Sequence, residues 1–119
     1  IFSQVKRPVF LGAVHNLVRN AGYWATRAKK EGKIRFTLAS NGFVISDSGG
    51  GVHERDKDRI FEPHFSRRSS GRGLGLFIAK SCLQAFGYGL ELLSAPAPGA
   101  LPGANFLISR PPNFENDVD

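Results

Sequence analysis

A glycine-rich stretch, Val44 to Ala79, most constrains what this chain can fold into. It begins with the acid–glycine turn 47–51 (DSGGG) and ends with three glycines at spacing two, Gly71, Gly73 and Gly75, which lead into an apolar helix. Glycine lacks a Cβ atom, so backbone N–H groups in such segments can approach a ligand closely. A helix that begins directly after them favours phosphate through its unpaired N–H groups and its dipole. The stretch therefore predicts a polyphosphate site, with a nucleotide as the first candidate ligand.

Length and composition indicate one globular domain. The 119 residues suffice for a buried core, and 41% hydrophobic with 22% charged residues exclude a disordered chain. No apolar run approaches the roughly 18 residues of a membrane span, so we expect no membrane contact by this domain. The lone cysteine, Cys82, cannot form an internal disulfide, which suits a reducing compartment. The expected location of the domain is cytoplasmic, with a membrane-anchored parent protein left open. We expect a fragment of a longer protein, with one domain over residues 1–111 and a polar tail over 112–119.

The net charge of +6 attracts polyanions in general. The basic residues are spread along the chain, and no basic patch is interleaved with aromatic residues, so nucleic acid is not an expected partner. A nucleotide triphosphate and a plainly soluble surface remain as alternative explanations of the charge.

Apolar periodicity predicts two helices. The first is expected from about residue 8 to residue 28, with Gly32 as its stop, and the second from about residue 74 to residue 86. A single short helical turn is expected over residues 56–61. The remaining periodic segments alternate polar and apolar residues, as half-buried strands do.

Four strands are expected, at 33–38, 43–46, 90–93 and 104–109. The Asn41-Gly42 dipeptide is a strong hairpin signal and pairs the first two, which carries Asp47 to the end of a central strand. The order of elements predicts an α+β fold, a two-layer α/β sandwich with a mixed, mostly antiparallel sheet and helices on one face.

Two common glycine motifs are excluded by their spacing. A Walker loop needs the pattern GxxxxGK[ST], which the chain lacks. A dinucleotide fingerprint needs GxGxxG directly after a strand, whereas residues 71–75 (GRGLG) have another spacing and follow a polar loop. The three glycines alone are a weak signal, and the polar residues elsewhere in the chain are needed to interpret them.

Two asparagines in the first predicted helix are polar residues that help to interpret the glycines. Asn16 and Asn20 are four positions apart and therefore lie on one helical face. Asparagine is a poor helix former, so a pair on one face calls for a reason. Its side-chain oxygen suits Mg²⁺, which proteins hold with few ligands of their own, together with phosphates and water.

Taken together, four segments resemble the N, G1, F and G2 boxes of the Bergerat-fold ATPases, in the form carried by sensor histidine kinases. In order, the boxes match residues 15–21 (HNLVRNA), 47–51 (DSGGG), 60–65 (IFEPHF) and 71–76 (GRGLGL). Each box alone is a modest signal, whereas four in order at suitable separations are a strong one. The resemblance spans about residues 8 to 110, and the superfamily also includes the gyrase B subunit, MutL and the large heat-shock chaperones.

The resemblance implies ATP and Mg²⁺ as cofactors and a role for each box. Asn20 would bind Mg²⁺, and Asn16 would support the phosphates or a metal-bound water. Asp47 would accept a hydrogen bond from the exocyclic amine of adenine. Arg67, Arg68 or Arg72 would neutralise charge on the transferred phosphoryl group, so that Asn16, Asn20, Arg67 and Arg68 are the expected catalytic residues. The remaining expected nucleotide contacts are Trp24, Gly49, Gly51, Phe61, Phe65, Gly71, Arg72, Gly73, Leu74, Gly75, Leu76 and Asn105.

The chain departs from the family pattern at several points. A lysine that contacts phosphate is usual three residues after the Asn20 position, where this chain has Tyr23. Arg19, Arg27 or basic residues of the lid are the alternatives for this contact. His64 stands where the F box usually has phenylalanine, and the lid between the F and G2 boxes is short. No phosphoacceptor segment precedes the boxes within this sequence.

The resemblance implies a catalytic domain that binds Mg·ATP and transfers the γ-phosphoryl group to a histidine on a separate segment or chain. Its expected partners are that phosphoacceptor domain, which also carries dimerisation, and a response regulator, so the fragment itself is expected to be monomeric. One alternative is an ATP-hydrolysing conformational switch of the same superfamily, whose members carry a glutamate as general base at the position of Asn16. A second alternative is a nucleotide-binding pseudokinase.

Overall fold

The computed structural model describes residues 6–27, 31–66 and 74–111. The predicted tail, 112–119, lies outside these residues. The elements are α1 (Lys6–Ala25), β1 (Ile34–Ala39), β2 (Gly42–Asp47), the short 3-10 helix η1 (Glu54–Asp56), α2 (Gly75–Ala85), β3 (Gly89–Leu92) and β4 (Asn105–Ser109). None of the described helices is both long and apolar enough to cross a bilayer.

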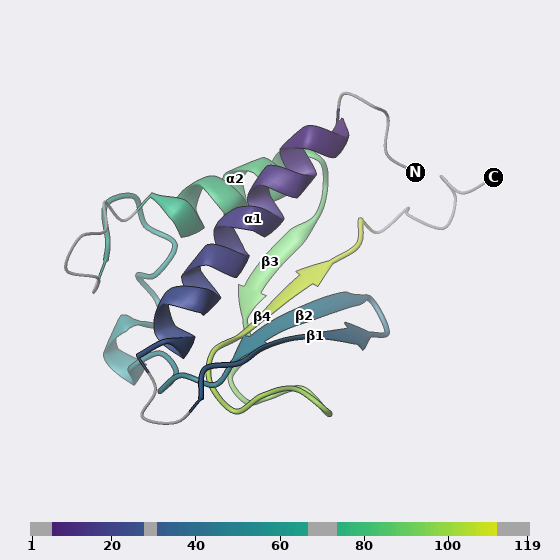
Figure 1. The fold of residues 1–119 in the computed structure, drawn as a ribbon. Coiled ribbons are helices and arrows are strands. Elements are labelled where there is room, and N and C mark those ends of the chain that lie inside the picture. The colour runs from purple at the N-terminus through teal and green to yellow at the C-terminus, as the bar shows by residue number, and fades with distance from the viewer. Residues whose placement is uncertain (1–5, 28–30, 67–73, 112–119) are drawn as a thin grey trace.

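The strands form one sheet in the order β1-β2-β4-β3, and both helices lie on one side of it (Figure 1). The two-layer α/β prediction is therefore confirmed. Each of the pairings β1–β2, β2–β4 and β3–β4 is antiparallel. The sheet, expected to be mixed and mostly antiparallel, is antiparallel at every pairing of the described strands.

The hairpin signal in the sequence places β2 inside the sheet. Ala39 pairs with Gly42, so the turn lies at Ser40-Asn41 and the expected hairpin forms. A Cβ atom at Gly42 would overlap the carbonyl oxygen of Ile108 in β4, which explains why glycine begins this strand. Because β2 lies between β1 and β4, Asp47 ends a central strand, as the pattern predicts.

Helix α1 ends earlier than expected, at Ala25. The chain continues for one tighter turn, in which the Arg27 N–H donates to the Trp24 carbonyl at 3.2 Å. Gly32 returns to this helix end, where a Cβ atom would lie 2.7 Å from the carbonyl oxygen of Ala25. Glycine at position 32 therefore permits a close approach of two backbones just after the helix.

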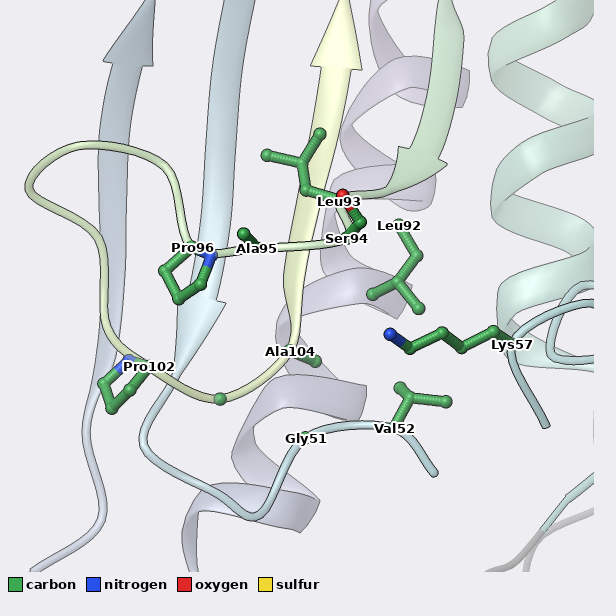
Figure 2. Close-up of a pocket in the computed structure, with 11 residues that line it drawn as sticks. Gly51, Val52, Lys57, Leu92, Leu93, Ser94, Ala95, Pro96, Pro102 and Ala104 are labelled. Atoms are coloured by element: carbon green, nitrogen blue, oxygen red, sulfur yellow. The ribbon is translucent and has the colours of Figure 1, made fainter. Parts of the chain in front are cut away.

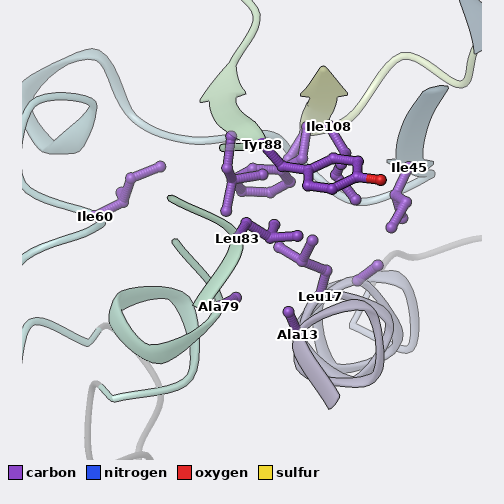
Figure 3. Close-up of a cluster of buried hydrophobic side chains, with 12 residues drawn as sticks. Ala13, Leu17, Ile45, Ile60, Ala79, Leu83, Tyr88 and Ile108 are labelled. Atoms are coloured by element: carbon purple, nitrogen blue, oxygen red, sulfur yellow. The ribbon is translucent and has the colours of Figure 1, made fainter. Parts of the chain in front are cut away.

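The hydrophobic core lies between the two helices and the facing side of the sheet (Figure 3). Leu17 of α1, Leu83 of α2 and Phe106 of β4 are each 2% exposed or less. The apolar stripes of both helices meet there, as their spacing predicts. The buried members of this cluster are Ala13, Leu17, Ala21, Ile45, Ile60, Ala79, Leu83, Tyr88, Leu90, Ala104, Phe106 and Ile108.

The opposite face of the sheet is covered by the loop of residues 93–104 rather than by a helix. Arg35 donates to the Gly99 carbonyl at 2.9 Å, and the Leu101 N–H donates to the Ser46 hydroxyl at 3.0 Å. Both contacts join the loop to outward-facing residues of β1 and β2. The loop therefore shields Val44 and Leu107, which are buried on that face.

The helix layer leaves most of β1 uncovered, although α1 approaches the strand at Ile34. Phe36 of β1 lies opposite Ile45, so its side chain is on the face that the helices pack against. Phe36 is nevertheless 55% exposed and Leu38 is 90% exposed. The helices thus cover β2, β4 and β3. The apolar side chains of the edge strand β1 lie on the same face of the sheet but are exposed to solvent.

The position of the core on α1 can be tested by substituting two leucines of this helix, Leu11 and Leu17. Leu17 is 1% exposed and Leu11 is 57% exposed. We expect Leu17→Ala to lower the free energy of unfolding by about 2–5 kcal/mol, because it removes buried contacts and leaves a cavity. The matched control Leu11→Ala should change it by about 0.5 kcal/mol or less. Urea denaturation measures both, and equal losses would contradict the assignment of the core face.

Candidate functional site

The Asp47 carboxylate is the most unusual polar group of the fold, because it is buried and only half satisfied. Its side chain ends the central strand β2 and is 1% exposed. One oxygen, Oδ1, accepts a hydrogen bond from the Gly49 N–H at 2.8 Å. The other, Oδ2, is buried with no hydrogen-bond partner in the described part of the chain. An unpaired buried acceptor costs on the order of 1–3 kcal/mol, more when charged. The residue thus presents an acceptor for an N–H donor that a ligand can supply.

The backbone on both sides of Asp47 is fixed by the segment that leads into β4. The Asp47 N–H donates to the Ala104 carbonyl at 3.2 Å, and the Gly103 N–H donates to the Asp47 carbonyl at 2.8 Å. Burial raises the pKa of Asp47, and hydrogen bonds from the backbone of Gly49 and Ala104 act in the opposite direction. The carboxylate is therefore held rigidly in a place where water does not compensate its charge.

Two glycines make room for this carboxylate. A Cβ atom at Gly49 would lie 2.9 Å from the Trp24 carbonyl oxygen and 3.0 Å from Asp47 Oδ1. A Cβ atom at Gly103 would overlap both Oδ1 and the carbonyl oxygen of Asp47. Gly49 is an expected site residue, whereas Gly103 is not among the contacts expected from the sequence. The two positions are far apart in sequence, so local pattern carries no signal for their contact.

Gly51 has a different role from Gly49. Its φ of 80° is in the left-handed region, and open space surrounds the position of a Cβ atom. Glycine is therefore required at residue 51 by the backbone conformation of the turn. Crowding does not require it.

Helix α1, whose end contacts the same turn, carries the expected polar residues. Asn16 and Asn20 are half-buried, and Trp24 is half-buried one turn further along. The Trp24 carbonyl faces Gly49, so the end of α1 and the 47–51 turn are in contact. Among the described residues, no three His, Cys, Asp or Glu side chains form a metal cluster. A Mg²⁺ ion shared between asparagine oxygens and phosphates does not need one.

The described part of the G2 box lies at the start of α2. Leu74 precedes the helix and its side chain makes no capping hydrogen bond, so the first N–H groups of α2 are not capped by that residue. Gly75 begins the helix with open space around it, and Leu76 packs against the core. Such a helix start suits phosphate. The other expected residues of the lid lie outside the described residues: Arg67, Arg68, Gly71, Arg72 and Gly73.

The two expected F-box rings pack against the core. The Phe61 ring meets the Phe106 ring edge-on at 6.1 Å, and the Lys80 ammonium lies 4.4 Å from its centroid. The Arg59 guanidinium lies 4.7 Å from the Phe65 centroid. These contacts anchor the segment that precedes the lid.

Asn105 is buried with every side-chain group engaged by backbone of the 97–103 loop. Its Nδ2 donates to the carbonyls of Leu101 and Gly103 at 2.9 and 3.0 Å. Its Oδ1 accepts from the Ala97 N–H at 3.2 Å. Asn105, expected as a nucleotide contact, is therefore placed as the residue that shapes the loop behind Asp47.

A small pocket lies at the same end of the sheet (Figure 2). Gly51 and Val52 form one wall, and Lys57 reaches across it toward Leu92. Its volume of about 160 Å³ is below the roughly 300–1,000 Å³ of ligand pockets. Lys57 also pairs with Glu54 at 2.9 Å. We therefore assign no nucleotide to this pocket by itself.

The crowding at Gly49 can be tested against Gly50, where a Cβ atom would meet nothing within 4 Å. We expect Gly49→Ala to destabilise the domain by about 1–3 kcal/mol, because the methyl group overlaps the Trp24 carbonyl and Asp47. Gly50→Ala should stay within about 0.5 kcal/mol of the wild type. Thermal unfolding of both variants gives the comparison, and a tolerated Gly49→Ala would contradict the packing described for this turn.

The buried carboxyl also predicts a pH dependence. Because the pKa of Asp47 is raised above its ordinary value of 3.8, the folded domain holds this proton more tightly than the unfolded chain. That stabilisation is present below pH 3.8 and is lost as the pH rises through the raised pKa. In urea titrations without nucleotide, wild-type stability should fall relative to Asp47→Asn as the pH increases from about 3.5 to about 7. Parallel pH profiles of the two proteins would contradict it.

Comparison with known proteins agrees with this geometry. Residues 8–112 match the family described as Histidine kinase-, DNA gyrase B-, and HSP90-like ATPase. The sensor histidine kinase ZraS of Klebsiella oxytoca is 32% identical over 99 residues, which covers 82% of this chain and 20% of that protein. The histidine-protein kinase/phosphatase MprB of Mycobacterium sp. (strain KMS) is 31% identical over 106 residues, which covers 83% of this chain and 20% of that protein. The chain thus spans about a fifth of the length of these curated relatives.

Solved structures give the same result. A mycobacterial sensor histidine kinase MprB matches with a TM-score of 0.59 and 30% identity, covering 84% of this chain and 70% of that one. The catalytic domain of histidine kinase ThkA, in a nucleotide-free form, matches with a TM-score of 0.65 and 25% identity, covering 88% and 68%. The chain belongs to the family of histidine kinase-, DNA gyrase B- and HSP90-like ATPases, and its relatives are sensor histidine kinases.

Proposed function

We propose that this domain binds ATP with Mg²⁺ and transfers the γ-phosphoryl group to a histidine on another segment or chain. The observation that carries the proposal is the buried Oδ2 of Asp47, which lacks a donor within the described residues. Adenine offers an exocyclic amine, whose N–H matches this acceptor. A base held there lies beside a glycine turn and the end of α1, where Gly49 touches the Trp24 carbonyl.

The remaining roles follow the positions of the side chains along α1. Trp24 lies beside the base, Asn20 supplies an oxygen to Mg²⁺, and Asn16 supports the phosphates or a metal-bound water. The uncapped start of α2 at Leu74 and Gly75 receives phosphate oxygens. Bound ATP supplies the transferable phosphoryl group. The protein contributes positioning and charge neutralisation, for which Arg67, Arg68 and Arg72 are the proposed cations.

Phosphotransfer is favoured over rapid hydrolysis by the amide at position 16. Hydrolysis needs a base that accepts a proton from water, and a neutral amide does not do so. An imidazole acceptor is itself the nucleophile, so the domain needs only to place the phosphoryl group before it. We propose a phosphoacceptor domain and a response regulator as partners, a cytoplasmic location, and a monomeric state for this fragment.

Calorimetry with ATP and ADP, with and without Mg²⁺, tests the nucleotide site. Asp47→Asn should weaken ATP binding about tenfold or more, since it removes a charge-assisted hydrogen bond of roughly 1.5–3 kcal/mol. Asp58→Asn, at an exposed position, is the matched control and should bind as the wild type does. A folded wild-type domain that binds neither nucleotide would overturn the proposal. If ATP binds, phosphate transfer to a separate phosphoacceptor domain decides between kinase and pseudokinase.

A further inference from the structure

We propose that Arg27, held on the ring of Tyr23, binds the phosphate nearest the ribose of the nucleotide. The inference rests on the proposed ATP site and names one further binding residue of that site. It follows from the phase of α1, from the contacts that hold the Arg27 side chain, and from the order of base and metal residues along the helix.

Arg27 continues the polar face of α1 on which the two asparagines lie. The Thr26 N–H donates to the Gly22 carbonyl at 3.1 Å, as in an α-helix, and the Arg27 N–H donates to the Trp24 carbonyl in the tighter turn that follows. At about 100° per residue, Asn16, Asn20, Tyr23 and Arg27 fall within about 60° of arc. Around the helix axis, Arg19 lies about 60° from Asn16 and about 100° from Asn20, beyond Tyr23. Arg19 is therefore outside this polar face. The polar face of α1 therefore carries two asparagines, followed by an aromatic ring and a cation.

Tyr23 holds the guanidinium of Arg27 back along the helix. The Arg27 Cζ atom lies 3.6 Å from the centroid of the Tyr23 ring, and its NH1 donates to the Tyr23 carbonyl at 3.3 Å. The Tyr23 ring in turn meets the Trp24 ring edge-on at 4.9 Å. A guanidinium stacked on a ring loses less conformational freedom when it binds an anion. The side chain is thus directed toward Asn20 and away from the loop that follows.

The level of Tyr23 on the helix lies between the base end and the metal end of the proposed site. The base end is marked by Gly49, which touches the Trp24 carbonyl. The metal end is marked by Asn20, about one helical turn or 5.4 Å further along α1. A cation at the level of Tyr23 therefore faces the part of the nucleotide that joins base to polyphosphate. That part is the ribose and its 5′-phosphate.

The charge of Arg27 is suited to that phosphate. The ion pairs of the described residues are Arg55–Asp56, Lys57–Glu54 and Arg59–Glu62, and none includes Arg27. Its side chain is exposed, and NH1 alone is used by the Tyr23 carbonyl. The remaining N–H donors form the fork geometry that guanidinium groups use to bind phosphate oxygens.

Calorimetry with adenosine, AMP, ADP and ATP on the whole chain tests this assignment. Arg27→Ala should weaken the binding of AMP, ADP and ATP about tenfold each, because all three carry the 5′-phosphate. It should leave the binding of adenosine unchanged, because adenosine has no phosphate. Arg27→Lys should recover part of the loss. Tyr23→Phe should bind like the wild type, whereas Tyr23→Leu should reproduce the Arg27→Ala pattern, since the ring that holds the guanidinium is gone.

Arg19→Ala is the matched control on the same helix, and all four ligands should bind it as they bind the wild type. A loss for adenosine equal to that for AMP would overturn the inference, as would a loss confined to ATP, or an equal loss in Arg19→Ala. If the wild type binds ATP and Arg27→Ala binds every ligand unchanged, this inference fails and the proposed function stands. A wild type that binds none of them overturns both. Thermal unfolding without ligand identifies any general loss of structure.

Discussion

The structure depends on one buried carboxylate that three segments of the chain hold in place. Asp47 is fixed through its own backbone by Gly103 and Ala104, and through Oδ1 by Gly49. The end of α1 closes the arrangement at the Trp24 carbonyl. A charge in such a place weakens the free protein, because burial disfavours it and Oδ2 gains no donor from the described residues. Unfavourable groups of this kind persist at ligand sites, where the surrounding structure holds them in place.

The parts of the fold with strong local patterns could be predicted from the sequence. The Asn41-Gly42 signal predicts the β1–β2 hairpin, and with it the position of Asp47 at the end of a central strand, although the turn itself lies at Ser40-Asn41. The apolar spacing of α2 predicts its buried residues, Ala79 and Leu83. In these segments the hydrophobic period and the turn residues agree with the final packing, so short windows of sequence suffice.

Features that depend on contacts between distant residues could not be predicted in this way. Gly103 gives room to Asp47, and Asn105 shapes the loop behind it. An isolated asparagine in a strand gives no sign whether its amide will meet a nucleotide or a carbonyl of its own chain. The four-box pattern predicts the candidate site, whereas the contacts of Gly103 and Asn105 around it are visible only in the three-dimensional structure.

The loop of residues 93–104 connects the two faces of the sheet. On the far side, its backbone is held by Arg35 and Ser46. At its end, Gly103 and Ala104 hold the backbone of Asp47. The loop therefore joins the face without helices to the backbone of Asp47. The carboxylate proposed to recognise adenine is thus held in place partly by a loop on the face of the sheet opposite the helices.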